Sequence, residues 1–165
     1  MTGVTVVGVT GHRSLPDPAL WSWVSDEIDR ALASLTPPVV GVSGLAEGAD
    51  QRFAECVLTG GGSLHAVLAF EGFGDSLEGR DAQEAFADLV ARADRVETIS
   101  PRATREFSYL AEGERVLELS DVLVAVWDGE PARGTGGTAE VVAQAQAKGI
   151  PVCHIDPTTR KVHWR

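Results

Sequence analysis

The chain alternates short apolar runs with longer segments of helical spacing, and this alternation limits its fold more than any other feature. Six runs are rich in β-branched residues and nearly apolar on both faces, as is typical of strands in a parallel sheet: residues 5–10, 39–42, 63–70, 95–99, 121–127 and 150–155. Amphipathic helices are predicted between them, at residues 20–35, 49–58, 81–93, 107–119 and 138–148. The alternation predicts an α/β, Rossmann-like, doubly wound fold, with a mainly parallel six-stranded sheet and helices on both faces.

The length of the chain, 165 residues, predicts a single domain over residues 1–165. The N-terminus has no basic leader followed by a long apolar region, and no stretch approaches the roughly 18 apolar residues of a membrane span. We therefore expect a cytoplasmic protein without a membrane partner. Cys56 and Cys153 lie far apart, and the histidines show no HExxH spacing, so we expect buried thiols and no metal site.

The balance of charges argues against a large polyanionic partner. Lys and Arg total 14 against 24 Asp and Glu, which gives a net charge of −10. A surface of this sign repels a phosphate backbone, so we expect no nucleic-acid partner. A small anion is still compatible with this charge, because backbone N–H groups at a helix N-terminus attract phosphate locally.

In a doubly wound sheet the ligand lies beyond the carboxyl ends of the strands, so the segments that directly follow each apolar run are candidates for the site. After the first run come Gly11, His12 and Arg13. Gly11 allows close approach of a ligand to the backbone, and Arg13 and His12 can donate to a phosphate or carboxylate. The alternative interpretation is a solvated turn that leads to the first helix.

The second run is followed by SGLAEGAD, residues 43–50, where Ser43, Gly44 and Gly48 lead to the N-terminus of a helix. The free N–H groups at such a turn can bind a phosphate. The segment matches neither GxGxxG nor GxxxxGK[ST], so an ordinary strand-to-helix turn with Asp50 in the first helical turn is a strong alternative.

The most specific candidate follows the fifth run. Asp128 comes first, and a segment of small and hydroxyl residues then leads straight into the last helix: Gly134, Thr135, Gly136, Gly137 and Thr138. Glycines expose backbone N–H groups, hydroxyls add donors, and the helix dipole favours negative charge, so we predict a phosphate-binding loop. Asp128 is predicted either to accept a hydrogen bond from a ribose hydroxyl or to stabilise a turn, in which its carboxylate accepts from a nearby backbone N–H.

Two further patterns leave alternatives open. Tyr109, Glu112 and Arg115 recur every third residue, which either turns a partly polar helix face toward the site or, more commonly, forms a solvated face with local ion pairs. Trp21 and Trp23 are expected to be exposed on the first helix and to pack in an interface, so we expect a homo-oligomer. The glycine-rich stretch at residues 71–80 is expected to be a mobile loop that closes over a ligand.

Three segments, GVTGHRSL, SGLAEGADQ and SDVLVAVWDGEPARGTGGTAEVVAQAQAKGIPV, together resemble the SLOG superfamily over almost the whole chain. This superfamily includes the DprA/Smf DNA-processing proteins and the LOG-type nucleotide phosphoribohydrolases. The resemblance implies a Rossmann-like fold and a nucleotide-derived ligand. In the LOG pattern PGGxGTxxE the acid would fall at Val141, and Glu140 is one residue early, about 100° around the helix.

Two functions follow from these observations. The first is binding, in a sensing role or otherwise, of a nucleotide or nucleotide-derived phosphate ligand, with no cofactor. The alternative is hydrolysis of the N-glycosidic bond of a nucleoside 5′-monophosphate, as the LOG-like resemblance implies. For that reaction the candidate catalytic residues are Glu140, Asp128 and Glu112.

Overall fold

A computed structural model gives the fold of the chain and describes residues 3–131 and 137–165. Within these residues seven strands form one sheet in the order β4-β3-β2-β1-β5-β6-β7. The strands are β1 (Thr5–Gly11), β2 (Val39–Ser43), β3 (Ser63–Leu68), β4 (Arg95–Thr98), β5 (Val122–Val126), β6 (Val152–Asp156) and β7 (Lys161–Trp164). All pairs are parallel except β6 with β7. The predicted Rossmann-like α/β class is confirmed, with one strand more than expected.

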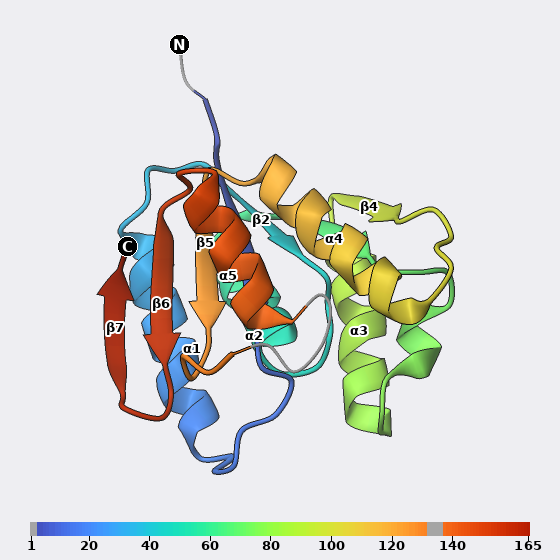
Figure 1. Cartoon of the computed structure of the whole chain (residues 1–165), viewed down its shortest axis with the longest axis horizontal. Helices are drawn as coiled ribbons and strands as arrows, with labels where there is room; N and C mark the ends of the chain where they lie inside the picture. Colours follow the sequence, from blue (N-terminus) through green and yellow to red (C-terminus); the bar gives the residue numbers. More distant parts are fainter. Residues whose placement is uncertain (1–2, 132–136) are drawn as a thin grey trace.

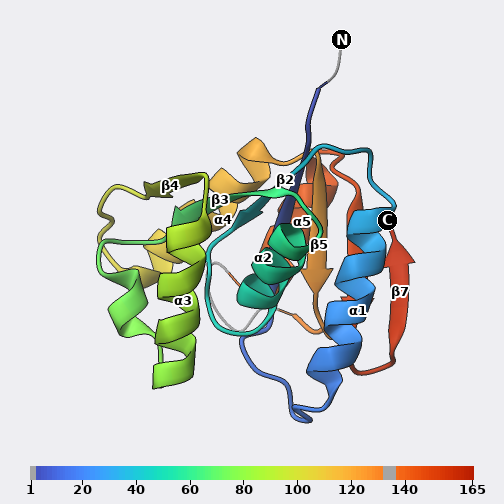
Figure 2. The ribbon, with the colours of Figure 1, turned by 180° about the vertical axis from the view of Figure 1, so that it is seen from behind.

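The helices cover both faces of this sheet. On one face lie α1 (Leu20–Ala33), α2 (Ala49–Thr59) and α3 (Arg80–Arg92), and on the other lie α4 (Arg105–Leu119) and α5 (Thr138–Ala147). Figure 1 shows α4 and α5 in front of the strands, and Figure 2 shows the layer of α1, α2 and α3 from behind. The chain thus forms three layers, as apolar strands with two buried faces require.

The position of β5 inside the sheet, between β1 and β6, explains why its sequence is apolar throughout. Successive side chains of a strand point to opposite faces. Val124 and Val126 pack with α1 and α2, whereas Leu123 and Ala125 pack with α4 and α5. All four are 0% exposed, so hydrophobic burial holds a helix layer on each side of β5.

The seventh strand was not predicted. β7 has only four residues, KVHW, and all of them are exposed, so it lacks the apolar run that marks β1, β2, β3, β5 and β6. It forms an antiparallel edge with β6, in which His154 pairs with His163 and Cys153 with Trp164. Cys153 and Cys56 are both free and buried, as expected from their spacing.

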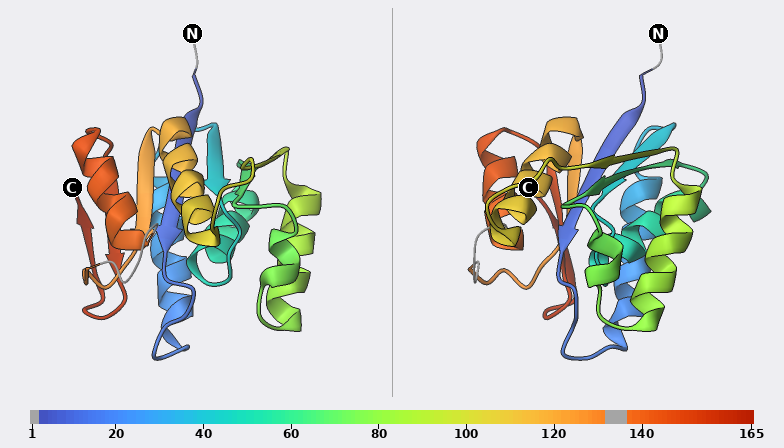
Figure 3. Two further views of the ribbon diagram at one scale, coloured as in Figure 1. Left: turned by 45° about the vertical axis from the view of Figure 1, so that its right-hand side comes forward. Right: turned by 90° about the vertical axis from the view of Figure 1, so that its right-hand side faces the viewer.

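The order of the strands places the site. The chain proceeds outward from β1 through β2 and β3 to β4, and then returns to β5 on the other side of β1. Connections therefore leave the carboxyl ends of β1 and β5 in opposite directions, which opens a crevice between them. Figure 3 shows that the chain enters β1 at one end of the sheet and that the loop after β1 lies at the opposite end.

Candidate functional site

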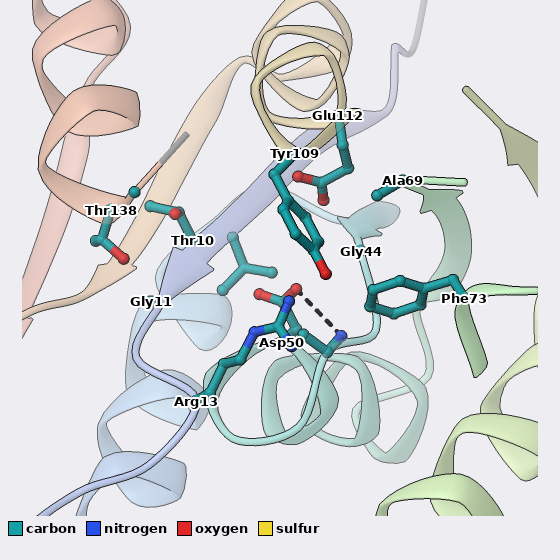
Figure 4. A pocket seen from close by; sticks show the side chains of 13 residues that line it. Thr10, Gly11, Arg13, Gly44, Asp50, Ala69, Phe73, Tyr109, Glu112 and Thr138 are labelled. Atoms are coloured by element: carbon teal, nitrogen blue, oxygen red, sulfur yellow. Dashed lines mark hydrogen bonds between the residues drawn. The ribbon is translucent and has the colours of Figure 1, made fainter. Parts of the chain in front are cut away.

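A cavity of about 420 Å³ lies at the carboxyl end of the sheet, beside the point where the strand order reverses. Its wall combines the ends of β1, β2 and β3 with side chains of α2, α4 and the first residues of α5 (Figure 4). The lining residues are Val9, Thr10, Gly11, Arg13, Gly44, Ala46, Asp50, Ala69, Phe73, Tyr109, Glu112, Gly137 and Thr138. Segments that are far apart in the sequence thus meet here, as the doubly wound topology predicts.

Among the residues that line this cavity, Arg13 is the one with a cationic side chain. Its Nη1 donates to the Glu47 carboxylate at 2.9 Å, and its guanidinium lies 5.2 Å from the ring centre of Tyr109 and 6.0 Å from that of Phe73. Burial by itself lowers the pKa of Arg13, but a hydrogen bond with the Tyr109 hydroxyl and the neighbouring carboxylates outweigh it and raise the pKa. The charge of Arg13 is therefore fixed and held over two aromatic rings.

Two carboxyl groups face the same cavity. Asp50 lies in the first turn of α2 and Glu112 in the middle of α4, and both side chains point toward the space above Gly44. Burial raises the pKa of Asp50 to about 7, although the Ala46 N–H and Arg13 oppose the shift. Burial and the charge of Asp50 raise the pKa of Glu112 well above its usual range. The pair therefore retains protons near neutral pH.

Ser43 and Gly48 do not line this cavity. The Ser43 hydroxyl is buried, donates to the carbonyl of Asp50 and accepts from the N–H of Leu45, so it closes the turn after β2. Gly48 has a φ of +85°, and a Cβ there would lie 2.5 Å from the carbonyl oxygen of Arg13. The turn after β2 packs directly against the turn after β1, which is why both residues serve the backbone rather than a ligand pocket.

Gly11 and Gly44 line the cavity, but neighbouring protein atoms explain why both are glycine. A Cβ at residue 11 would lie 2.6 Å from the Ala49 Cβ and 2.8 Å from the Val126 carbonyl oxygen. A Cβ at residue 44 would overlap the Glu112 carboxyl and lie 3.1 Å from Asp50 Oδ2. The expected close approach of a ligand is thus not needed to explain either glycine.

His12 and Asp128 join the loops after β1 and β5. The N–H of Asp128 donates to Nε2 of His12 at 3.0 Å, and Oδ1 of Asp128 lies 3.4 Å from the same nitrogen. With Nε2 as the acceptor, Nδ1 is the ring nitrogen that can donate. The Asp128 carboxylate accepts from the N–H of Glu130 at 2.9 Å, which is the turn alternative given for this residue. Both residues line a second hollow of about 560 Å³, which meets the first along Gly11, Arg13, Gly137 and Thr138.

The N-terminus of α5 faces both hollows. Gly137 precedes the first turn, and no side chain of the described residues caps the helix. Thr138 lines both hollows, whereas Glu140 is not among the residues that line them. The predicted ligand residues Gly134, Thr135 and Gly136 lie outside the described residues.

Sequence reasoning missed part of the wall. Asp50 was interpreted as an ordinary first-turn residue. The solvated face was the favoured interpretation for Tyr109 and Glu112, although Glu112 was also named as a candidate catalytic residue. Tyr109 and Glu112 instead face the cavity, whereas Arg115, a further 60° around α4, pairs with Glu97 at 3.0 Å. The one available signal was the place of Asp50 in the first turn of the helix that follows β2, at the carboxyl end of the sheet.

The glycine-rich stretch at residues 71–80 also contributes to the wall. It contains a 3-10 turn at Phe73–Ser76, and Phe73 and Leu77 are buried against Ala46 and Ala69. Phe73 supplies an aromatic side of the cavity. Two buried anchors therefore hold this segment at the site.

The two tryptophans of α1 are not exposed as expected. Trp21 and Trp23 are partly buried against the core cluster between α1, α2 and the sheet, and Arg52 lies 5.3 Å from the ring centre of Trp21. Large rings beside the buried stripe of Val24 and Ile28 widen the contact of α1 with its neighbours. Among the described residues, the structure has no helix with the length and apolar character needed to cross a membrane.

Comparison with known proteins gives the fold. No family model and no curated protein matches the chain. The solved structure of DNA processing protein A (DprA) from Streptococcus pneumoniae matches with a TM-score of 0.65 and 20% identity, over 91% of this chain and 50% of that one. DprA from Helicobacter pylori matches with a TM-score of 0.63 and 20% identity, over 94% of this chain and 70% of that one. The structural genomics target TM1055 matches with a TM-score of 0.56 and 19% identity, over 90% of this chain and 72% of that one.

These matches correct one expectation. DprA from Helicobacter pylori has a single-stranded DNA binding mode, so at least one protein with this fold binds nucleic acid. The expectation of no nucleic-acid partner, which rested on the net charge of −10, was therefore wrong as an inference. The net charge describes the whole surface, whereas a ligand interacts with the charges close to its own binding site. The chain has the fold of these DprA structures and of TM1055.

Proposed function

We propose that this chain binds a nucleotide or nucleotide-derived phosphate ligand in the cavity at the carboxyl ends of β1 and β2. One observation carries the proposal: Arg13 and the N-terminus of α5 both line the edge that the two hollows share. The N–H groups of a helical first turn have no intrahelical partner and attract a phosphate, and an arginine adds paired donors and charge. Both sources of donors lie at the topological switch point, where doubly wound sheets bind ligands.

The surroundings of Arg13 suit an exchangeable anion. Glu47 now pairs with its Nη1, and the Arg13 side chain is 45% exposed, so a phosphate can reach it. The rings of Phe73 and Tyr109 supply apolar surface for a sugar or a base beside that phosphate. A phosphate bound in this way would compete with Glu47 for one guanidinium.

Titration calorimetry tests the proposal with nucleoside mono-, di- and triphosphates, NAD, ADP-ribose, cyclic nucleotides and a single-stranded oligonucleotide. We expect Arg13→Ala to weaken binding of the best ligand by about tenfold or more, the loss of a charged hydrogen bond. The matched control is Arg80→Ala, which removes an arginine that is 86% exposed on α3. Equal affinities of both variants, or no binding of any compound to the unaltered chain, would contradict the proposal.

A second candidate is hydrolysis of an N-glycosidic bond, and the raised pKa of Glu112 favours it. Such a reaction needs a group that gives a proton to the departing base and a carboxylate that orients water. Glu112 and Asp50 provide both protonation states in one cavity. Release of free base from a bound nucleoside monophosphate, and its loss in Glu112→Gln, would support hydrolysis, whereas binding without release would leave a binding protein.

A further inference from the structure

The cavity has an acidic side that a phosphate site does not explain. The carboxyl groups of Asp50 and Glu112 come from helices on opposite faces of the sheet and converge over the backbone of Gly44. Gly44 has no Cβ, and the Glu112 carboxyl occupies the space that a Cβ would fill. A phosphate placed here would meet like charge, so this side of the cavity suits a different part of the ligand.

The two carboxyl groups have unused hydrogen-bonding capacity. Asp50 Oδ2 accepts from the N–H of Ala46 at 3.3 Å, which leaves its other oxygen for the cavity. None of the described residues donates a hydrogen bond to Glu112, whose carboxyl points into the cavity (Figure 4). Both residues are partly exposed and line the cavity, so a ligand or water can reach these oxygens.

The protonation of the pair defines the chemistry of that partner. Both pKa values are raised, so near neutral pH the pair offers at least one O–H donor together with several acceptor oxygens. Arg13 balances the remaining negative charge. A neutral group that both donates and accepts fits such a pair, and the hydroxyls of a sugar are groups of this kind.

We propose that Asp50 and Glu112 bind the ribose hydroxyls of the ligand, so that the cavity selects ribonucleotides over 2′-deoxyribonucleotides. The inference rests on the proposed function, because it places the phosphate at Arg13 and the N-terminus of α5. The sugar then lies between that phosphate position and the carboxyl pair, beside Tyr109 and Phe73. The 2′-hydroxyl is the group through which a protein distinguishes a ribonucleotide from its deoxy counterpart.

The test compares matched ribonucleoside and 2′-deoxyribonucleoside 5′-monophosphates of each base, with inorganic phosphate as a third probe, by titration calorimetry. The unaltered chain is expected to prefer the ribonucleotide about tenfold, as expected for one hydrogen bond to a partly charged group. Glu112→Leu should reduce that preference to about one and leave the affinity for inorganic phosphate unchanged. Glu114→Leu changes an exposed carboxylate on the same helix and should keep the preference.

A second variant distinguishes loss of the Glu112 contact from misfolding of the Glu112→Leu variant. Gly44→Ala keeps every carboxyl group but displaces that of Glu112, so it too should remove the preference. Equal affinities of the unaltered chain for both sugars, or a preference that survives in Glu112→Leu and Gly44→Ala, would overturn this inference while nucleotide binding stands. Failure of nucleotides and phosphate alike to bind would instead overturn the proposed function.

Discussion

Asp50 is the residue whose ionisation is most clearly linked to folding. Its pKa is about 7 in the folded chain, against roughly 3.9 for an unfolded aspartate. Between about pH 4 and pH 7 the folded state holds a proton that the unfolded state has released. The free energy of unfolding therefore falls as the pH rises through this window, by up to about 1.4 kcal/mol per pH unit for one proton. Glu112 acts in the same direction.

Asp50→Asn should remove this contribution, because the amide does not ionise and its oxygen can still accept from Ala46. We expect the variant to gain stability relative to the unaltered chain as the pH rises from 4.5 to 7.5, measured by urea unfolding at several pH values. Asp26→Asn, at an exposed position of α1, is the control and should follow the unaltered chain. Parallel curves for Asp50→Asn and the unaltered chain would show that Asp50 ionises as it does in water.

At the scale of elements, α4 carries Tyr109 and Glu112 into the cavity, and its first turn depends on one cap. The Thr104 hydroxyl accepts from the N–H of Phe107 at 3.2 Å, whereas α2 and α5 have no side-chain cap. Thr104→Ala should lower the free energy of unfolding by about 1 kcal/mol, and Thr104→Ser should retain most of it. Equal urea midpoints for both variants would mean that the cap adds nothing to the stability of α4.

At the scale of the whole molecule, one sheet connects both helix layers, and we propose that the chain unfolds as a single domain. Ile155→Val removes one methylene from a fully buried side chain of β6 and should cost about 0.5 to 1.5 kcal/mol. Far-UV circular dichroism and the fluorescence of the four tryptophans should report one shared transition that shifts equally. Two separate transitions would divide the chain into independent units. Val96→Ala, at a 42% exposed position of edge strand β4, should change little.

The sequence by itself determined the layered fold, because that depends on local periodicity. Runs apolar on both faces, such as β5, can be buried only between two helix layers, and their alternation with helices leaves few topologies. It also located the ends of β1 and β2 as candidates for the site. The exposed strand β7 had no such pattern and was missed.

Only the tertiary structure decided what the candidate residues do. Gly44 was expected to admit a ligand but makes room for Glu112, a residue 68 positions later. The Nε2 of His12 accepts from the backbone of Asp128, a contact between two distant loops that the sequence does not indicate. Asp50 and Glu112 acquire raised pKa values only because α2 and α4 place them together in one partly buried cavity. Contacts between distant segments and the desolvation they cause leave no periodic trace in the sequence, so packing alone set these roles.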